Sequence, residues 1–162
     1  MKLKLMLFNA ISGSIILFHS DVWAQTENTL THFMGVSGVC EELLIQNEPV
    51  LCKKDLFHSE YENGRLGFWF FSDDGKTSMS FTGYGQNQIT IDRNTRRFNL
   101  DGVVVEIGKL SASGSCLFEN PFIGEAKIEC EALDLDGYHY RGKFLTDGSK
   151  PKIIIPSGDA TE

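Results

Sequence analysis

Turn-forming dipeptides are the feature of this sequence that most limits the folds open to it. Asn-Gly or Asp-Gly pairs recur along the chain. They lie at residues 63–64, 74–75, 101–102, 136–137 and 147–148. Such pairs adopt the positive φ values that a two-residue β-hairpin turn requires. Their repetition predicts a meander of short antiparallel strands.

The segments between these turns have the composition of strands. Several alternate polar and apolar residues or are runs of β-branched residues, which favours strands. These segments are residues 77–82, 88–92, 103–107 and 153–155. Residues 66–71 contain three Phe and Trp69, which predicts a strand buried on both faces. Residues 40–45 could form one helical turn. We expect an all-β domain, a small antiparallel barrel or sandwich of about eight to ten strands.

Two parts of the chain share a spacing of glycines and aromatic residues. Residues 64–75 and 137–148 have equal lengths, and Phe71 and Phe144 hold the same place in them. This is compatible with two similar halves. The distance from the preceding cysteine to the first glycine differs between the halves, so chance similarity is the alternative.

The N-terminus has the three parts of a secretory signal peptide. Lys2 and Lys4 precede an apolar stretch over residues 5–18, and a Val-Trp-Ala site ends at Ala24. The apolar stretch is shorter than the ~20 residues of a membrane span. We expect residues 1–24 to be removed and residues 25–162 to form one domain in the periplasm or outside the cell. An uncleaved membrane anchor is the alternative.

Four cysteines fall in the expected mature chain. An even number in an exported protein predicts disulfide bonds. We expect Cys40–Cys52 and Cys116–Cys130, because each pair encloses a short loop with turn-compatible residues at its centre, 46–47 in one and 121–124 in the other. A zinc site is the alternative, but it would require closer Cys or His spacing.

The charge balance disfavours nucleic acid as a partner. The full chain has 15 basic and 22 acidic residues, and the expected signal peptide removes two lysines and one aspartate, which leaves a net charge of −8. An acidic domain is repelled by phosphate backbones. No second apolar run of the mature chain is long enough to span a bilayer.

The sequence offers no recognisable catalytic or metal site. His32, His58 and His139 have no metal-binding spacing, and residues 134–137 form only part of a calcium loop. The cysteines are assigned to disulfides, so no thiol nucleophile is left. We therefore expect no metal, no cofactor and no enzymatic activity.

Two features point instead to binding. Arg93, Arg96 and Arg97 cluster in an otherwise acidic chain. They could contact an anion or a partner, or could form a charged loop that prevents edge pairing. The aromatic residues at 68–71 could pack the core or line a cavity in the mouth of a barrel.

Two resemblances bear on function. The signal peptide, C-x11-C, Y-x-N-G-R, an aromatic strand and F-x-G together resemble small uncharacterised exported proteins of Gram-negative bacteria. Residues 111–114, Ser-Ala-Ser-Gly, are similar to a loop of the periplasmic C-type lysozyme inhibitors, which are small disulfide-bonded β-barrels. This second resemblance implies that Ser111 and Ser113 contact a protein partner, although the chain departs from the family pattern directly after Gly114.

Together these features predict an exported, non-catalytic binding module of the bacterial cell envelope. Its partner is an unknown protein or envelope component. The residues expected to contact it are Arg93, Arg96, Arg97, Ser111 and Ser113. The alternative is a β-barrel carrier of a small apolar ligand, and an enzyme is the third choice.

Overall fold

The computed structural model describes residues 29–154. The expected signal peptide and its cleavage site lie outside these residues. The described residues include no helix with the length and apolarity needed to cross a membrane.

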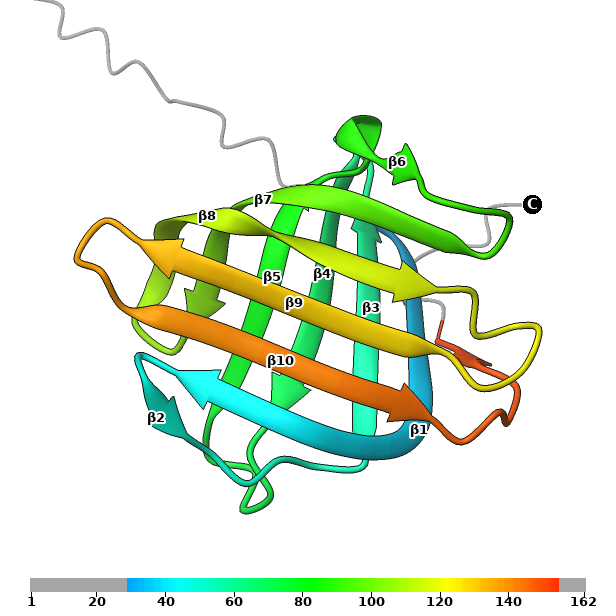
Figure 1. Ribbon diagram of the computed structural model, residues 1–162, viewed down its shortest axis with the longest axis horizontal. Coiled ribbons are helices and arrows are strands. Elements are labelled where there is room, and N and C mark those ends of the chain that lie inside the picture. The colour runs from blue at the N-terminus through cyan, green and yellow to red at the C-terminus, as the bar shows by residue number, and fades with distance from the viewer. Residues whose placement is uncertain (1–28, 155–162) are drawn as a thin grey trace, which may run out of the picture.

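Eight antiparallel strands form a closed barrel (Figure 1). Each strand pairs with the next in the meander, and pairing of the last with the first closes the barrel. The strands are β1 (Leu30–Ile45), β3 (Asp55–Tyr61), β4 (Arg65–Phe71), β5 (Ser78–Tyr84), β7 (Thr95–Val105), β8 (Gly108–Glu119), β9 (Lys127–Asp134) and β10 (His139–Thr146). Three two-residue strands, β2 (Glu48–Pro49), β6 (Ile89–Thr90) and β11 (Lys152–Ile153), and one 3-10 turn, η1 (Gly85–Asn87), flank the barrel. The expected all-β barrel is confirmed.

Strand β1 closes the barrel because it pairs with two different strands along its length. Its first half pairs with β3 and its second half with β10. At Gly38, between the halves, a Cβ atom would collide with the backbone of Leu145, so only glycine allows this close approach. The helical turn considered for residues 40–45 is wrong, since these residues continue β1.

The chain turns at four of the five predicted positions, but none of these is the predicted two-residue hairpin turn with positive φ at both residues. Gly64, Gly75, Gly137 and Gly148 have positive φ in turns. The Asp101–Gly102 pair instead lies inside β7, where the register with β5 and β8 shifts. Among the described residues, both members of a turn pair have positive φ only at Gln46–Asn47, between β1 and β2.

Both predicted disulfides are present. Cys40 of β1 bonds to Cys52, which follows β2, with Cα atoms 5.8 Å apart. Cys116 and Cys130 face each other across β8 and β9. One bond thus joins a barrel strand to a connecting segment, and the other joins two paired barrel strands. The two halves therefore share the spacing of their turn glycines but not the placement of their disulfides. Structural disulfides of this kind are typical of an oxidising compartment outside the cytoplasm.

Aromatic side chains fill the half of the barrel interior that lies away from the start of β1. Phe70, Phe81, Tyr140 and Phe144 are almost completely buried. The Phe70 ring crosses the interior from β4 to β10, where a Cβ atom on Gly142 would lie 2.6 Å from its Cζ atom. A small barrel is expected to be filled in this way.

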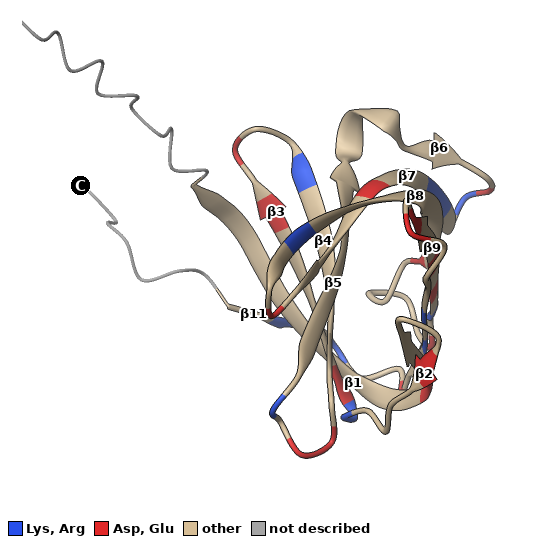
Figure 2. Ribbon diagram, turned by 90° about the vertical axis from the view of Figure 1, so that its left-hand side faces the viewer, with Lys and Arg blue, Asp and Glu red and all other residues tan. Residues whose placement is uncertain are grey.

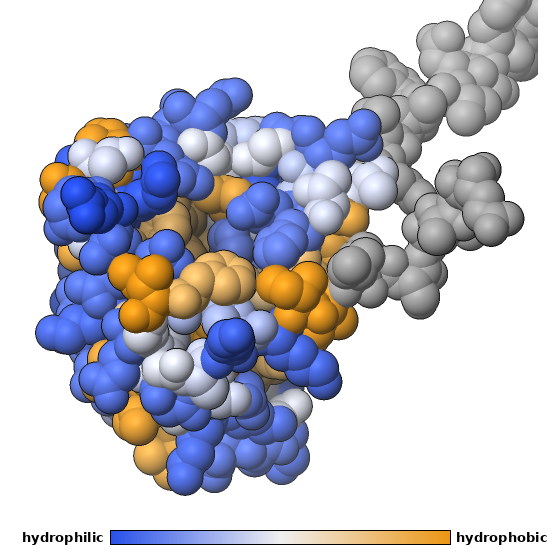
Figure 3. Space-filling model, turned by 90° about the vertical axis from the view of Figure 1, so that its right-hand side faces the viewer, coloured by the Kyte–Doolittle hydropathy of each residue, from blue (hydrophilic) through white to orange (hydrophobic). Residues whose placement is uncertain are grey.

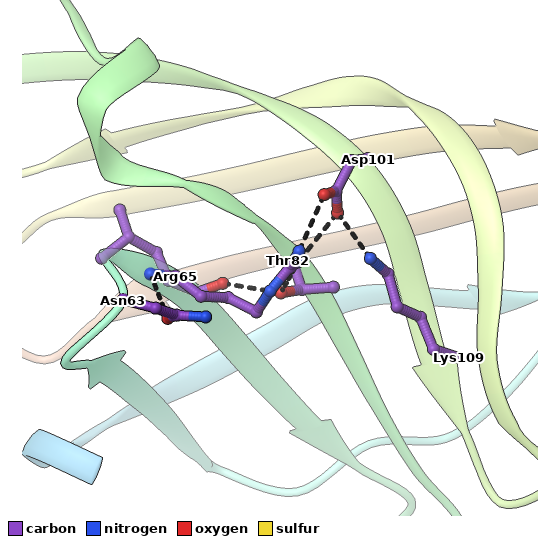
Figure 4. A network of polar contacts seen from close by, with 6 residues as sticks. Asn63, Arg65, Thr82, Asp101 and Lys109 are labelled. Carbon is purple, nitrogen blue, oxygen red and sulfur yellow. Dashed lines mark hydrogen bonds and ion pairs between the residues drawn. The ribbon is translucent and has the colours of Figure 1, made fainter. Parts of the chain in front are cut away.

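An outer polar network holds four strands together (Figure 4). The Arg65 guanidinium on β4 donates two hydrogen bonds, of 2.8 and 2.9 Å, to the two carboxylate oxygens of Asp101 on β7. It donates a third to Thr82 Oγ1 on β5, and Lys109 Nζ of β8 lies 3.1 Å from Asp101 Oδ1. These contacts explain why Asp101 stays within a strand and does not form a turn.

Candidate functional site

A cavity of about 230 Å³ opens at one end of the barrel. Viewed from that end, hydrophobic side chains are visible within a hollow bordered by hydrophilic ones (Figure 3). The cavity lies between the first half of β1, β3, the middle of β4, the β6–β7 connection and the β8–β9 connection. Its apolar lining consists of Met34, Val36, Leu56, Phe68, Phe118 and Ile128, with Pro121 and Phe122 at the rim. Its polar lining consists of His32, His58, Glu60, Arg93, Asn94, Arg96, Glu119 and Asn120.

Two neighbouring strands give the cavity wall a gradient of polarity. In a strand every second residue points to the same face, so β1 and β3 each supply three residues to the wall. The facing pairs, from deep to outer, are Val36 with Leu56, Met34 with His58, and His32 with Glu60. The wall therefore changes from apolar at its base to ionisable at its mouth.

Beneath the cavity the aromatic rings are packed together. The Phe68 centroid lies 5.2 Å from that of Phe118 and 6.0 Å from that of Phe98. Phe98 is fully buried, while Phe68 and Phe118 also face the cavity. This cluster forms an apolar floor above the filled half of the barrel.

A histidine and a glutamate form a polar pair in the wall. His58 is 8% exposed, and its Nδ1 lies 3.1 Å from the carbonyl oxygen of Gly67. Its Nε2 lies 3.1 Å from Glu60 Oε1. The hydrogen bond from His58 lowers the pKa of Glu60, and the positive potentials of His58 and His32 act in the same direction. Since a carbonyl and an ionised carboxylate can only accept, the ring satisfies both partners when both of its nitrogens carry hydrogen.

Two of the three predicted arginines reach the cavity. Arg96 on β7 lies two residues before the buried Phe98, so its side chain is on the inner face, and Arg93 precedes it in the β6–β7 connection. This connection carries basic residues in Figure 2. Neither Arg93 nor Arg96 forms an ion pair with any residue between 29 and 154. Arg97 points to the opposite face of β7 and does not line the cavity.

Hydrogen bonds fix the two connections that form the rim. Asp92 Oδ1 accepts from the backbone N–H groups of Asn94 and Thr95, and these bonds lower the pKa of Asp92. The N–H group of Asn120 donates to the carbonyl oxygen of Asn94, which joins the β6–β7 and β8–β9 connections. Glu119 Oε2 accepts from the backbone N–H of Lys127. The rim is therefore held in place by hydrogen bonds within the chain itself.

The remaining predicted contact residues lie elsewhere. Ser111 and Ser113 are exposed residues within β8 and pair with β7 and β9. The prediction that residues 111–114 form a loop is wrong. At Gly114 a Cβ atom would collide with the Glu131 backbone, so this segment is pressed tightly against β9.

The grouping of His32, His58 and Glu60 was not predicted from the sequence. The two histidines were interpreted as isolated because 26 positions separate His32 from His58. The useful signal was the His-Ser-Glu sequence at residues 58–60, which places His58 and Glu60 on one face of a strand. The pairing of β1 with β3, which brings His32 beside Glu60, was not encoded in any local motif.

Within residues 29–154, no group of three or more His, Cys, Asp or Glu side chains is arranged to hold a metal ion. Comparison with protein-family models, with curated proteins and with solved structures found no match. The site is therefore interpreted from its own geometry.

Proposed function

We propose that this protein is a non-catalytic binding protein that holds a small molecule with an apolar body in the open end of its barrel. The observation that supports this most directly is a cavity with an apolar floor, a graded wall and a polar rim. Ligand sites in proteins typically combine apolar walls with a few fixed polar groups.

The cavity size limits the ligand. A buried apolar cavity of ~150 Å³ accommodates benzene, and drug-sized molecules occupy pockets of about 300–1,000 Å³. A cavity of about 230 Å³ lies between these cases. The ligand is therefore a short acyl chain or a small ring compound, with any larger part outside the rim.

Binding in the barrel accounts for more of the structure than docking of a large partner. The Ser-Ala-Ser-Gly segment belongs to a strand with neighbours on both sides, so it offers no loop for insertion into a partner's cleft. The cavity, by contrast, brings together Arg93, Arg96 and Phe68, which is the one cavity-lining member of the aromatic residues at 68–71. We place this activity in the periplasm or outside the cell, where two disulfides are stable.

A pair of tryptophan variants tests this proposal. Met34→Trp should fill the cavity, whereas Val39→Trp adds the same side chain to an exposed position on the same strand. In titration calorimetry with octan-1-ol, the wild type and Val39→Trp should bind the alcohol and Met34→Trp should not. Thermal unfolding checks that both variants fold. Equal binding by all three proteins, or by none, contradicts the proposal.

A further inference from the structure

We propose that the ligand of this cavity is an acid, with its apolar body against the aromatic floor and its anionic head group bound by Arg93 and Arg96. The inference rests on the proposed function, and it adds the chemical class of the ligand.

The charged groups at the cavity differ in whether they already have partners. Glu60 is held by His58, and the Glu119 carboxylate accepts a hydrogen bond from the Lys127 backbone. The Arg93 and Arg96 guanidiniums have no carboxylate partner among residues 29–154. Arg96 has one long hydrogen bond, of 3.4 Å, to Thr90 Oγ1. Arg93 and Arg96 therefore line the cavity with positive charges that no carboxylate of these residues neutralises, and Glu119 adds a negative charge that no basic side chain of these residues neutralises.

The two half-buried arginines of the described residues, Arg65 and Arg141, are both paired. Arg65 binds Asp101 through both carboxylate oxygens, and Arg141 lies 3.4 Å from Glu42. The chain has an excess of acidic residues, so partners for arginine are abundant. The three exposed arginines, Arg93, Arg96 and Arg97, have no ion pair among residues 29–154, and of these only Arg93 and Arg96 line the cavity, where a bound acid would supply their partner.

The guanidinium group suits this task. Its planar arrangement of donors matches carboxylate and phosphate oxygens and forms two parallel hydrogen bonds with them. Next to an apolar cavity such bonds are less screened by water than on an open surface. An acid with a short apolar body would thus pack against the aromatic floor and also bind the arginines at the rim. A neutral molecule would pack against the floor but would leave the arginines without an anionic partner.

The position of Arg97 provides a matched control. It neighbours Arg96 in the sequence and has the same charge, but it points away from the cavity. General attraction of acids by a basic segment would involve Arg97 as much as Arg93 and Arg96. Recognition of a head group at the rim would involve only the latter two.

The test compares three ligands that share one chain, octanoate, octyl phosphate and octan-1-ol. Titration calorimetry is performed with wild type, Arg93→Gln/Arg96→Gln and Arg97→Gln. At least one of the two acids should bind wild type about tenfold more tightly than octan-1-ol, as expected for charge-assisted hydrogen bonds. The double variant should lose this advantage and keep its affinity for octan-1-ol. Arg97→Gln should behave as wild type, within about twofold.

The outcomes separate this inference from the proposed function. If wild type binds all three compounds equally, the cavity binds apolar molecules but the ligand is not an acid. If the acids keep their advantage in the double variant, or lose it equally in Arg97→Gln, the assignment to Arg93 and Arg96 is wrong. If no compound binds, both proposals are overturned. A preference for octanoate or for octyl phosphate distinguishes a carboxylate from a phosphate head group.

Discussion

At the scale of single residues, the cavity wall depends on the contact between His58 and Glu60. An imidazole that is 8% exposed requires hydrogen-bond partners, and the Gly67 carbonyl and Glu60 supply them. Both ring nitrogens of His58 already contact protein groups, Glu60 on β3 and the Gly67 carbonyl oxygen on β4. His58 therefore does not compete with Arg93 and Arg96 for a head group. The His58–Glu60 pair therefore stabilises the cavity wall, and the arginines at the rim bind the ligand head group.

The same contact predicts a pH-dependent term in stability. Folding lowers the pKa of Glu60 from its ordinary value of 4.5, so the stabilisation is present above that value and is lost as the pH falls through the lower, folded-state pKa. Glu60→Gln should reduce the free energy of unfolding by under about 1 kcal/mol at neutral pH, since the glutamate is partly exposed. Urea unfolding of wild type and variant should converge as the pH is lowered below about 4. Glu62→Gln, at an exposed position in the next turn, is the control, and a constant difference across pH would contradict this account.

The contact of Phe70 with Gly142 predicts a coupled pair of substitutions. Gly142→Ala would place a methyl group against the Phe70 ring, which is almost fully buried, and should cost about 1–3 kcal/mol. In a Phe70→Leu background the ring is absent, so the same alanine should cost less. A double-mutant cycle by urea unfolding measures this coupling. Additive effects of the two substitutions would show that the ring does not rest on Gly142.

At the scale of strands and turns, Asp101 organises the outer face of the barrel. Arg65 and Lys109 hold the pKa of its carboxyl group below the usual range, with the Arg65 hydrogen bonds as the main cause. Asp101→Asn should lower the free energy of unfolding by about 1 kcal/mol, a modest value because the carboxylate is 41% exposed. Lys109→Gln should cost less, since the two bonds from Arg65 remain. Equal losses in chemical denaturation would contradict the ranking.

The disulfides make a second prediction at this scale. They join residues 12 and 14 positions apart, so loop closure should contribute about 3 kcal/mol in each case. Cys116 and Cys130 are also buried, whereas Cys40 and Cys52 are half-buried. Cys116→Ala/Cys130→Ala should therefore lose about 1 kcal/mol more than Cys40→Ala/Cys52→Ala, because it also leaves a cavity. Calorimetric unfolding of the two variants compares these losses, and a larger loss in the Cys40 and Cys52 variant would count against this packing argument.

Local sequence signals predicted most elements and failed where distant strands decide the outcome. Asn63-Gly64 and Asp136-Gly137 form turns in open space, since no heavy atom beyond the chain neighbours lies within 4 Å of a Cβ built on either glycine. Asp101-Gly102 has the same signal but becomes a bulge, because Arg65 and Lys109 bind its carboxylate and Gly102 packs against Leu110. Residues 111–114 resembled a loop and are held in β8 by strands on both sides.

At the scale of the whole molecule, closure of the barrel creates the site. Arg93 and Arg96 were predictable as a charged cluster, but the sequence did not indicate which arginines face inward. The β1–β3 pairing and the β6–β7 connection bring His32, Glu60 and Arg93 to one mouth, although they are far apart along the chain. Only the pairing order of the strands specifies this arrangement.

The central claim is that a small molecule binds in the open end of the barrel. Residues 29–154 contain two methionines, Met34 in the cavity wall and Met79 in the filled half of the interior. Methionine methyl NMR during a titration with octan-1-ol tests the claim directly. The account predicts a saturable change in the Met34 methyl signal and an unchanged Met79 signal. An unchanged Met34 signal, or equal changes at both methyl groups, would contradict it.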